Sequence, residues 1–197
     1  MQYLSESIDL PVSEETAFNV LSDLDKILRL SPYWSLKALK PFSTGDIREG
    51  GKYEATIEYY GRELTETHGL EVIEFLKNRR ISLKAGNGLL KEIRFALEKK
   101  NAGIRLTQQF LLQSEDGPLL QGTQRELSVW LRSIGEYIKL AGGKTLWKRF
   151  LKWFMDRVWL KLTLSERKIA GIITKISIIE ILLLLLLVIL WNLFVNY

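Results

Sequence analysis

Two segments of the chain alternate between apolar and polar residues. In both, polar side chains that could do chemistry occupy positions where the alternation predicts apolar ones. In residues 64–72, Glu66 and His68 share the parity of the apolar side chains around them, and in residues 104–112 Gln108 does the same. A carboxylate that faces an apolar interior is costly unless it is paired or protonated, and an adjacent imidazole could partner it. We therefore predict that Glu66, His68 and Gln108 orient the polar end of an otherwise hydrophobic ligand.

The same segment allows an alternative phase. Ile73 and Phe75 are apolar on the opposite parity, so a β-bulge at Gly69 would turn Glu66 and His68 to solvent. A lone His outside any motif is also compatible with a purely structural role. Both orientations remain open at the level of sequence.

Aromatic residues are placed to line or plug an interior. They belong to strands and helices that the sequence predicts to face a common core, and aromatic side chains serve equally as core or as the walls of a cavity. The predicted ligand-lining aromatic residues are Trp34, Tyr53, Tyr59, Trp130 and Tyr137.

The composition leaves little catalytic machinery. With one His and no Cys, only Ser, Lys, Tyr or carboxylate side chains could be nucleophiles, and none lies in a G-x-S-x-G or S-x-x-K context. No cluster of His, Asp and Glu has metal-ligand spacing, and no Gly-rich loop fits a phosphate-binding fingerprint. We expect no catalytic residue, no metal and no cofactor; an enzyme would need acid–base work from Glu66 and His68 or from a Tyr hydroxyl.

The alternating segments belong to a simple order of elements. Residues 2–10 predict a strand, Ser13 is suited to cap the helix that follows, and residues 25–30 predict a second short helix. About six strands of period two come next, and residues 123–140 predict a long helix with one apolar stripe. One apolar face per strand is typical of an antiparallel sheet covered on one side, so we predict an α+β fold in which this helix covers the sheet.

Three stretches of sequence resemble a known family: IDLPVSEETAFNVLSDLD, the SPYW that follows, and VWLRSIGEYIKL. Over residues 1–141 the chain resembles the START-like polyketide cyclase superfamily (SRPBCC). The resemblance implies the helix-grip fold, a curved antiparallel sheet of six to seven strands around a long C-terminal helix. It also implies a hydrophobic ligand between helix and sheet; some members are enzymes such as aromatase/cyclases, and many carry lipids or quinones.

The basic charge is confined to one part of the chain. Residues 1–143 contain 19 Lys and Arg against 20 Asp and Glu, whereas residues 144–175 contain 9 against 2. A nucleic-acid reader carries its basic patch on the folded domain, so we expect no nucleic-acid partner. A basic flank retains the near side of a membrane helix in the cytoplasm and can bind anionic headgroups.

Residues 142–171 predict a basic, Trp-rich amphipathic segment. At helical spacing, the apolar residues of 144–168 share one wide side and a narrow basic strip lies opposite. That pattern is typical of a helix in the headgroup region, although the apolar side could instead pack on the domain or on a partner protein. The predicted membrane-interface residues are Trp147, Phe150, Trp153, Phe154 and Trp159.

Residues 172–195 are apolar enough to cross a membrane. No side chain from 181 to 191 carries a formal charge, and twenty helical residues at about 1.5 Å each span roughly 30 Å, the thickness of the hydrocarbon core. We expect a single-pass membrane protein with its N-terminal domain in the cytoplasm and its C-terminus outside. The N-terminus lacks a signal-peptide pattern, and the absence of Cys suits a reducing compartment.

Together these features predict a membrane-anchored domain that binds a lipid, an isoprenoid or a quinone-like molecule. Two alternatives remain: a cyclase or dehydratase that acts on a hydrophobic substrate, and a membrane adaptor whose cavity is filled by its own side chains and whose Trp-rich segment binds another membrane protein. The shortage of catalytic residues ranks binding above catalysis.

Overall fold

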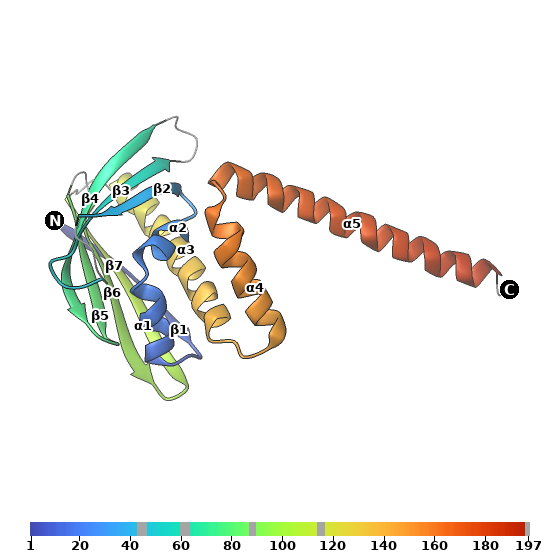
Figure 1. Cartoon of the computed structure of the whole chain (residues 1–197), viewed down its shortest axis with the longest axis horizontal. Helices are drawn as coiled ribbons and strands as arrows, with labels where there is room; N and C mark the ends of the chain where they lie inside the picture. Colours follow the sequence, from blue (N-terminus) through green and yellow to red (C-terminus); the bar gives the residue numbers. More distant parts are fainter. Residues whose placement is uncertain (43–46, 60–63, 87–89, 114–116, 196–197) are drawn as a thin grey trace. The chain divides into compact units, whose positions relative to one another are not determined.

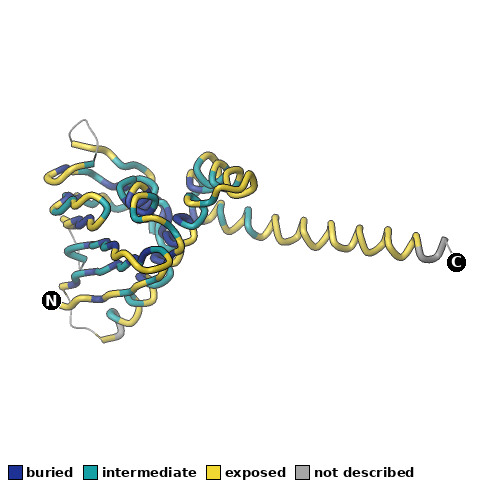
Figure 2. Tube along the Cα trace, turned by 90° about the horizontal axis from the view of Figure 1, so that it is seen from below, coloured by how far each residue is buried: buried dark blue, intermediate teal, exposed yellow. Residues whose placement is uncertain are grey.

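The computed structural model describes residues 1–42, 47–59, 64–86, 90–113 and 117–195 of the chain. The chain divides into two compact units, Met1–Lys161 and Leu162–Tyr197. Figure 2 shows the buried residues gathered inside the first unit, where a sheet and its helices meet.

The first unit is a sheet of seven antiparallel strands with helices on one face (Figure 1). The strands lie in the order β1-β7-β6-β5-β4-β3-β2, so β1 and β2 form the edges. The elements are β1 (Gln2–Leu10), α1 (Glu14–Leu21), α2 (Leu24–Arg29), β2 (Trp34–Pro41), β3 (Lys52–Tyr59), β4 (Thr65–Leu76), β5 (Arg80–Ala85), β6 (Leu90–Lys100), β7 (Gly103–Leu112), α3 (Gly117–Ala141), α4 (Leu146–Arg157) and the 3-10 helix η1 (Trp159–Lys161). The α+β fold and the count of six to seven strands are confirmed.

Side-chain caps set the starts of the two short helices. The Ser13 hydroxyl accepts the Thr16 backbone N–H, and the Asp23 carboxylate accepts the Lys26 backbone N–H. Each cap satisfies a donor that the first turn of a helix otherwise leaves unpaired. The predicted cap at Ser13 is therefore confirmed.

Helix α3 packs its apolar stripe on the concave face of the sheet. The stripe recurs at helical spacing and is almost fully buried, and it contains Leu127, Trp130, Leu131, Ile134, Tyr137 and Ile138. Gly135 allows the close approach to β1, because a Cβ there would come within 2.2 Å of the Ile8 Cδ1 atom. The helix begins at Gly117, earlier than the sequence pattern predicted.

Strand β4 changes phase at Ile73. The register with β5 shifts between Val72 and Glu74, and Ile73 is exposed at the bulge. The bulge therefore lies four residues beyond Gly69, the position considered from sequence. Because the phase changes only there, Glu66 and His68 keep the parity of the buried Leu70.

The first compact unit extends through Lys161 and so includes α4 and η1, while the domain boundary at residue 141 stays a prediction. Helix α4 packs against α3, and Leu160 in η1 is only 3% exposed within the core. A continuous helix over 144–168 is not formed: at Val158 (φ −120°, ψ −65°) the chain leaves α4 and turns Leu160 inward. Burial of this side chain is the physical reason for the break.

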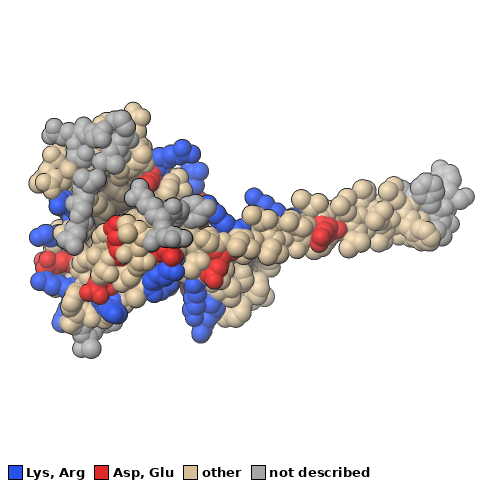
Figure 3. Space-filling view, turned by 90° about the horizontal axis from the view of Figure 1, so that it is seen from above, with Lys and Arg blue, Asp and Glu red and all other residues tan. Residues whose placement is uncertain are grey.

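The second unit contains one helix, α5 (Leu164–Val195). Thr163 and Glu166 form a reciprocal cap at its start, since the Glu166 carboxylate accepts the Thr163 N–H and the Thr163 hydroxyl accepts the Glu166 N–H. Its stretch Leu164–Asn192 has 29 residues and contains an 18-residue window with a mean hydropathy of 2.8 and no buried residue, so it is long and apolar enough to span a membrane. Figure 3 shows α5 as mostly uncharged along its length.

Candidate functional site

The centre of the concave face is filled by the indole of Trp130. This α3 side chain is 2% exposed, and its Nε1–H donates to the Ile27 backbone carbonyl of α2 at 3.1 Å. The Trp34 indole of β2 donates likewise to the Leu28 carbonyl at 3.1 Å, and the two indole rings meet edge to face at 5.0 Å. Two hydrogen bonds thus fix both indoles against α2.

The Trp130 ring also contacts β6 and β7, which lie near the other edge of the sheet from β2. Its centroid lies 6.2 Å from that of Phe95 on β6 and 5.9 Å from that of Phe110 on β7. These are favoured distances for aromatic pairs. Trp130 is buried at this place and Trp34 packs against it partly buried, and the ligand-lining role of both stays a prediction.

Gln108 is the one buried residue in the described chain whose whole side-chain amide lacks a partner. It lies on β7, is 0% exposed, and neither Oε1 nor Nε2 is hydrogen-bonded. Its cross-strand neighbour Glu6 is engaged by Gln124, whose Nε2 donates to Glu6 Oε1 at 2.7 Å. A buried amide without a partner is costly, so a water or a ligand group is the natural complement of Gln108. Its predicted inward orientation is confirmed.

Tyr59, His68 and Glu66 form a cluster on β3 and β4. The His68 Nε2 atom is 3.2 Å from Glu66 Oε2 and 3.3 Å from the Tyr59 hydroxyl. The His68 side chain is 17% exposed and that of Glu66 40%, so the cluster opens to solvent at its carboxylate end. It can hold or exchange a proton or bind a polar group; its role in ligand orientation stays a prediction.

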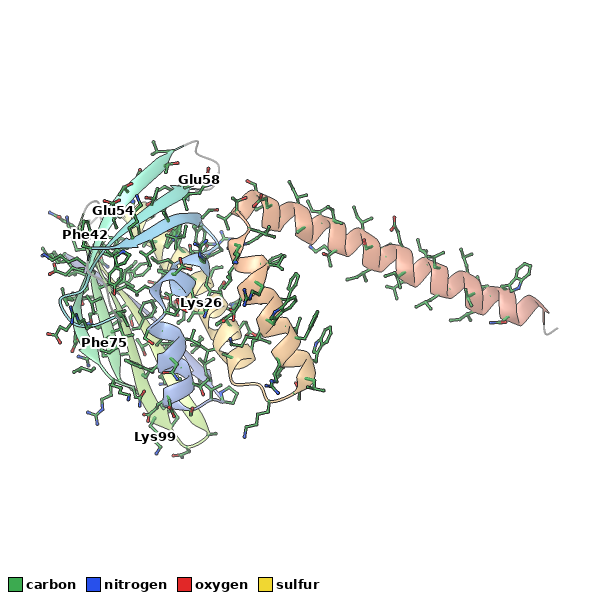
Figure 4. The ribbon with its side chains drawn as sticks, in the orientation of Figure 1. Lys26, Phe42, Glu54, Glu58, Phe75 and Lys99 are labelled. Atoms are coloured by element: carbon green, nitrogen blue, oxygen red, sulfur yellow. The ribbon has the colours of Figure 1, made fainter. Side chains whose placement is uncertain are left out.

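Tyr53 lies elsewhere, in a groove of about 610 Å³ between α1, α2 and strands β2 to β4. The groove combines apolar and polar side chains: Phe18, Leu24, Leu39, Ile47, Tyr53 and Phe75 with Asn19, Ser22, Asp23, Asp25 and Lys77. The Phe18 and Phe75 rings meet edge to face at 5.3 Å and form part of its wall. Figure 4 labels Phe75, whose strand lies opposite α1.

Sequence reasoning found Tyr53 but missed Phe18 and Phe75. In a regular strand Phe75 would lie on the face opposite to Leu70 and Val72. The bulge at Ile73 shifts the alternation by one residue and brings Phe75 to the inner face. The position of Phe18 depends on how α1 lies over the sheet, which no local pattern encodes.

Tyr137 faces α4. Its hydroxyl donates to the Asp156 carboxylate, to which Lys152 Nζ also donates at 2.8 Å. Burial raises the pKa of Tyr137, and the hydrogen bond to Asp156 adds to that rise. Although burial opposes it, the hydrogen bonds from Lys152 and Tyr137 lower the pKa of Asp156. The pair joins α3 to α4, and the ligand-lining role of Tyr137 stays a prediction.

The structure thus distributes the predicted ligand-lining residues over four places: the filled centre with Trp34, Trp130 and Gln108, the Tyr59 cluster, the groove with Tyr53, and the contact between α3 and α4 with Tyr137. Within the described ranges, no group of three or more His, Cys, Asp and Glu side chains could hold a metal.

Solved structures of three bacterial proteins share this architecture. The Aha1 dimer from Colwellia psychrerythraea is 15% identical with a TM-score of 0.53, over 73% of this chain and 100% of that chain. The AHSA1-like protein from Aeromonas hydrophila is 16% identical with a TM-score of 0.54, over 72% and 94% of the two chains. The chain has the helix-grip fold. Protein CV1439 from Chromobacterium violaceum agrees, at 14% identity and a TM-score of 0.56 over 71% and 99%.

No protein-family model and no curated protein sequence matches the chain. At identities of 14 to 16% the likeness establishes the helix-grip fold alone. The fold expected from the SRPBCC resemblance is confirmed, and the ligand has to be argued from the site.

Replacing Gln108 by Met tests whether its amide is unpartnered in the folded protein. The free energy of unfolding should rise by about 1–3 kcal/mol, because the substitution removes the cost of a desolvated amide at nearly constant volume. Urea unfolding in detergent, followed by near-ultraviolet circular dichroism, measures it. The control is Gln109→Met on the opposite parity, which should change stability by no more than about 0.5 kcal/mol. A loss of stability at position 108 would show that the amide already has a partner.

Proposed function

We propose that the protein is a membrane-anchored domain that binds a hydrophobic ligand in the groove between α1, α2 and strands β2 to β4. The observation that carries this proposal is the contrast within one concave face. Trp130 is 2% exposed and fills the centre with its own side chain, whereas Tyr53 and Phe75 are only partly buried and line the groove beside α1.

The groove has the properties of a ligand site. Its volume of about 610 Å³ falls in the range of about 300–1,000 Å³ that is usual for small-molecule sites. The partly buried Tyr53 and Phe75 supply accessible apolar area, and apolar area provides most of the affinity for such a ligand. Asn19 and Lys77 are polar residues among its lining that could orient a head group.

Membrane anchoring supports a ligand that partitions into the bilayer. Helix α5 is long and apolar enough to insert, and a tether raises the effective concentration of the domain at the surface. A lipid, an isoprenoid or a quinone-like molecule is a ligand that the domain could take from the bilayer. The basic residues of 144–175 and the absence of Lys and Arg after Lys175 favour the N-terminal unit in the cytoplasm and the C-terminus outside.

Blocking the groove should abolish ligand retention without unfolding the domain. Asn19 is exposed on α1 and lines the groove, so Asn19→Trp should lower the hydrophobic compound that co-purifies by about tenfold or more, equivalent to 1.4 kcal/mol or more of binding free energy. The matched control is Glu15→Trp, which places the same ring one turn earlier on α1, outside the groove lining.

Mass spectrometry of organic extracts of the full-length protein, at equal thermal stability of the variants, measures this content. Equal content in Asn19→Trp and Glu15→Trp would exclude the groove as the binding site.

The proposed orientation predicts the outcome of a protease-protection assay. Protease added to intact cells should leave residues 1–161 uncut, because the basic flank holds that side in the cytoplasm. Permeabilising the cells should then expose the domain to cleavage and serves as the control. Cleavage of the domain in intact cells would contradict the orientation.

The filled centre favours a second function, that of a membrane adaptor. If Trp130 and its ring neighbours leave no room for a ligand anywhere in the grip, the domain would act through its surface. Purified protein without any hydrophobic compound, yet fully folded, would support the adaptor over the carrier.

A further inference from the structure

Helix α4 carries an exposed row of large apolar side chains. Leu146 is 82% exposed, Trp147 66%, Phe150 52% and Trp153 55%. The three rings stack in sequence, with centroids 5.7 Å and 5.9 Å apart and interplanar angles of 27°. Figure 4 shows the ring-bearing side chains of α4 on the side of the helix away from α3. We call the three aromatic residues among them, Trp147, Phe150 and Trp153, the aromatic row.

The opposite side of α4 contacts the domain with polar groups. Asp156 accepts the Tyr137 hydroxyl of α3 and is paired with Lys152, while Met155 packs against the core. A surface helix of a soluble domain normally does the reverse and buries its apolar stripe. Contiguous exposed apolar surface of this kind marks an interaction site.

Charge and chain connection indicate what the aromatic row meets. Residues 144–161 contain six Lys and Arg, at positions 144, 148, 149, 152, 157 and 161, against one acid, Asp156. Apolar rings flanked by basic residues, with Trp among them, are typical of a helix that lies at a lipid headgroup layer. Only residues 162 and 163 separate Lys161 from the start of α5, so insertion of α5 would hold α4 close to a bilayer surface.

We infer that the aromatic row is the surface by which the Met1–Lys161 unit docks on the bilayer, with its rings in the headgroup region and the flanking basic residues on anionic headgroups. Because the polar side of α4 is engaged by α3, the domain itself then lies on the aqueous side of the helix. The inference rests on the membrane anchoring proposed for α5.

The lack of native Cys allows a direct depth measurement on the full-length protein. Single Cys residues introduced as Phe150→Cys, Leu185→Cys and Phe42→Cys each receive a nitroxide spin label. The proteins are reconstituted in vesicles of phosphatidylcholine and phosphatidylglycerol, and collisions of the label with oxygen and with a water-soluble nickel complex are compared. Phe42 is the matched control, since it is an aromatic residue directly after β2 and is 69% exposed. Leu185 reports on α5.

The label at position 150 should collide more with oxygen than with the nickel complex, as the label at 185 should, while the label at 42 should show the reverse. Removing phosphatidylglycerol should move the label at 150 outward; an unchanged depth would overturn the role of the basic residues. Trp147→Cys provides a second site should Phe150→Cys fail to fold.

Preference of the label at 150 for the nickel complex, with 185 buried in lipid, would overturn the docking surface and leave the anchor intact. Exposure of 185 to the nickel complex would instead remove the anchoring on which the inference rests. Spin–spin broadening at 150 with access to neither reagent would identify a second copy as the occupant and contradict the lipid contact.

Discussion

The hydrogen bond from the Trp130 indole to the Ile27 carbonyl is the contact on which the first unit depends. It ties α3 to α2, while the ring faces of the same indole meet Trp34, Phe95 and Phe110 from β2, β6 and β7. One side chain therefore links both helices, α2 and α3, to three strands of the sheet. Burying the indole N–H without a hydrogen-bond acceptor would be costly. The Ile27 carbonyl of α2 is that acceptor, in the position where the ring fills the space between helix and sheet.

The same contact decides where a ligand can lie. An indole that fills the centre leaves the groove beside α1, lined by the partly buried Tyr53 and Phe75, as the place that we propose for a ligand. Gln108 marks a residual cost of this arrangement, because its amide is enclosed without a partner a short way along β7 from Phe110.

Features encoded by local periodicity were predictable from the sequence. The strand at residues 2–10, the Ser13 cap and the α3 stripe each depend on neighbours within a few residues, and all are present. The sequence left two phases of β4 open, and the bulge at Ile73 that turns Phe75 inward arises from the register with β5. The groove depends on how α1 lies over β4, and the break at Val158 depends on the burial of Leu160, so tertiary packing decides both.

The central claim is that a hydrophobic ligand occupies the groove beside α1 and not the centre of the grip. Nuclear Overhauser contacts between the protons of the co-purifying compound and isotope-labelled protein test it most directly. The account predicts contacts to Phe18, Tyr53 and Phe75. Contacts confined to Trp130 and Phe110 would show that the centre opens to admit the ligand and would contradict the account.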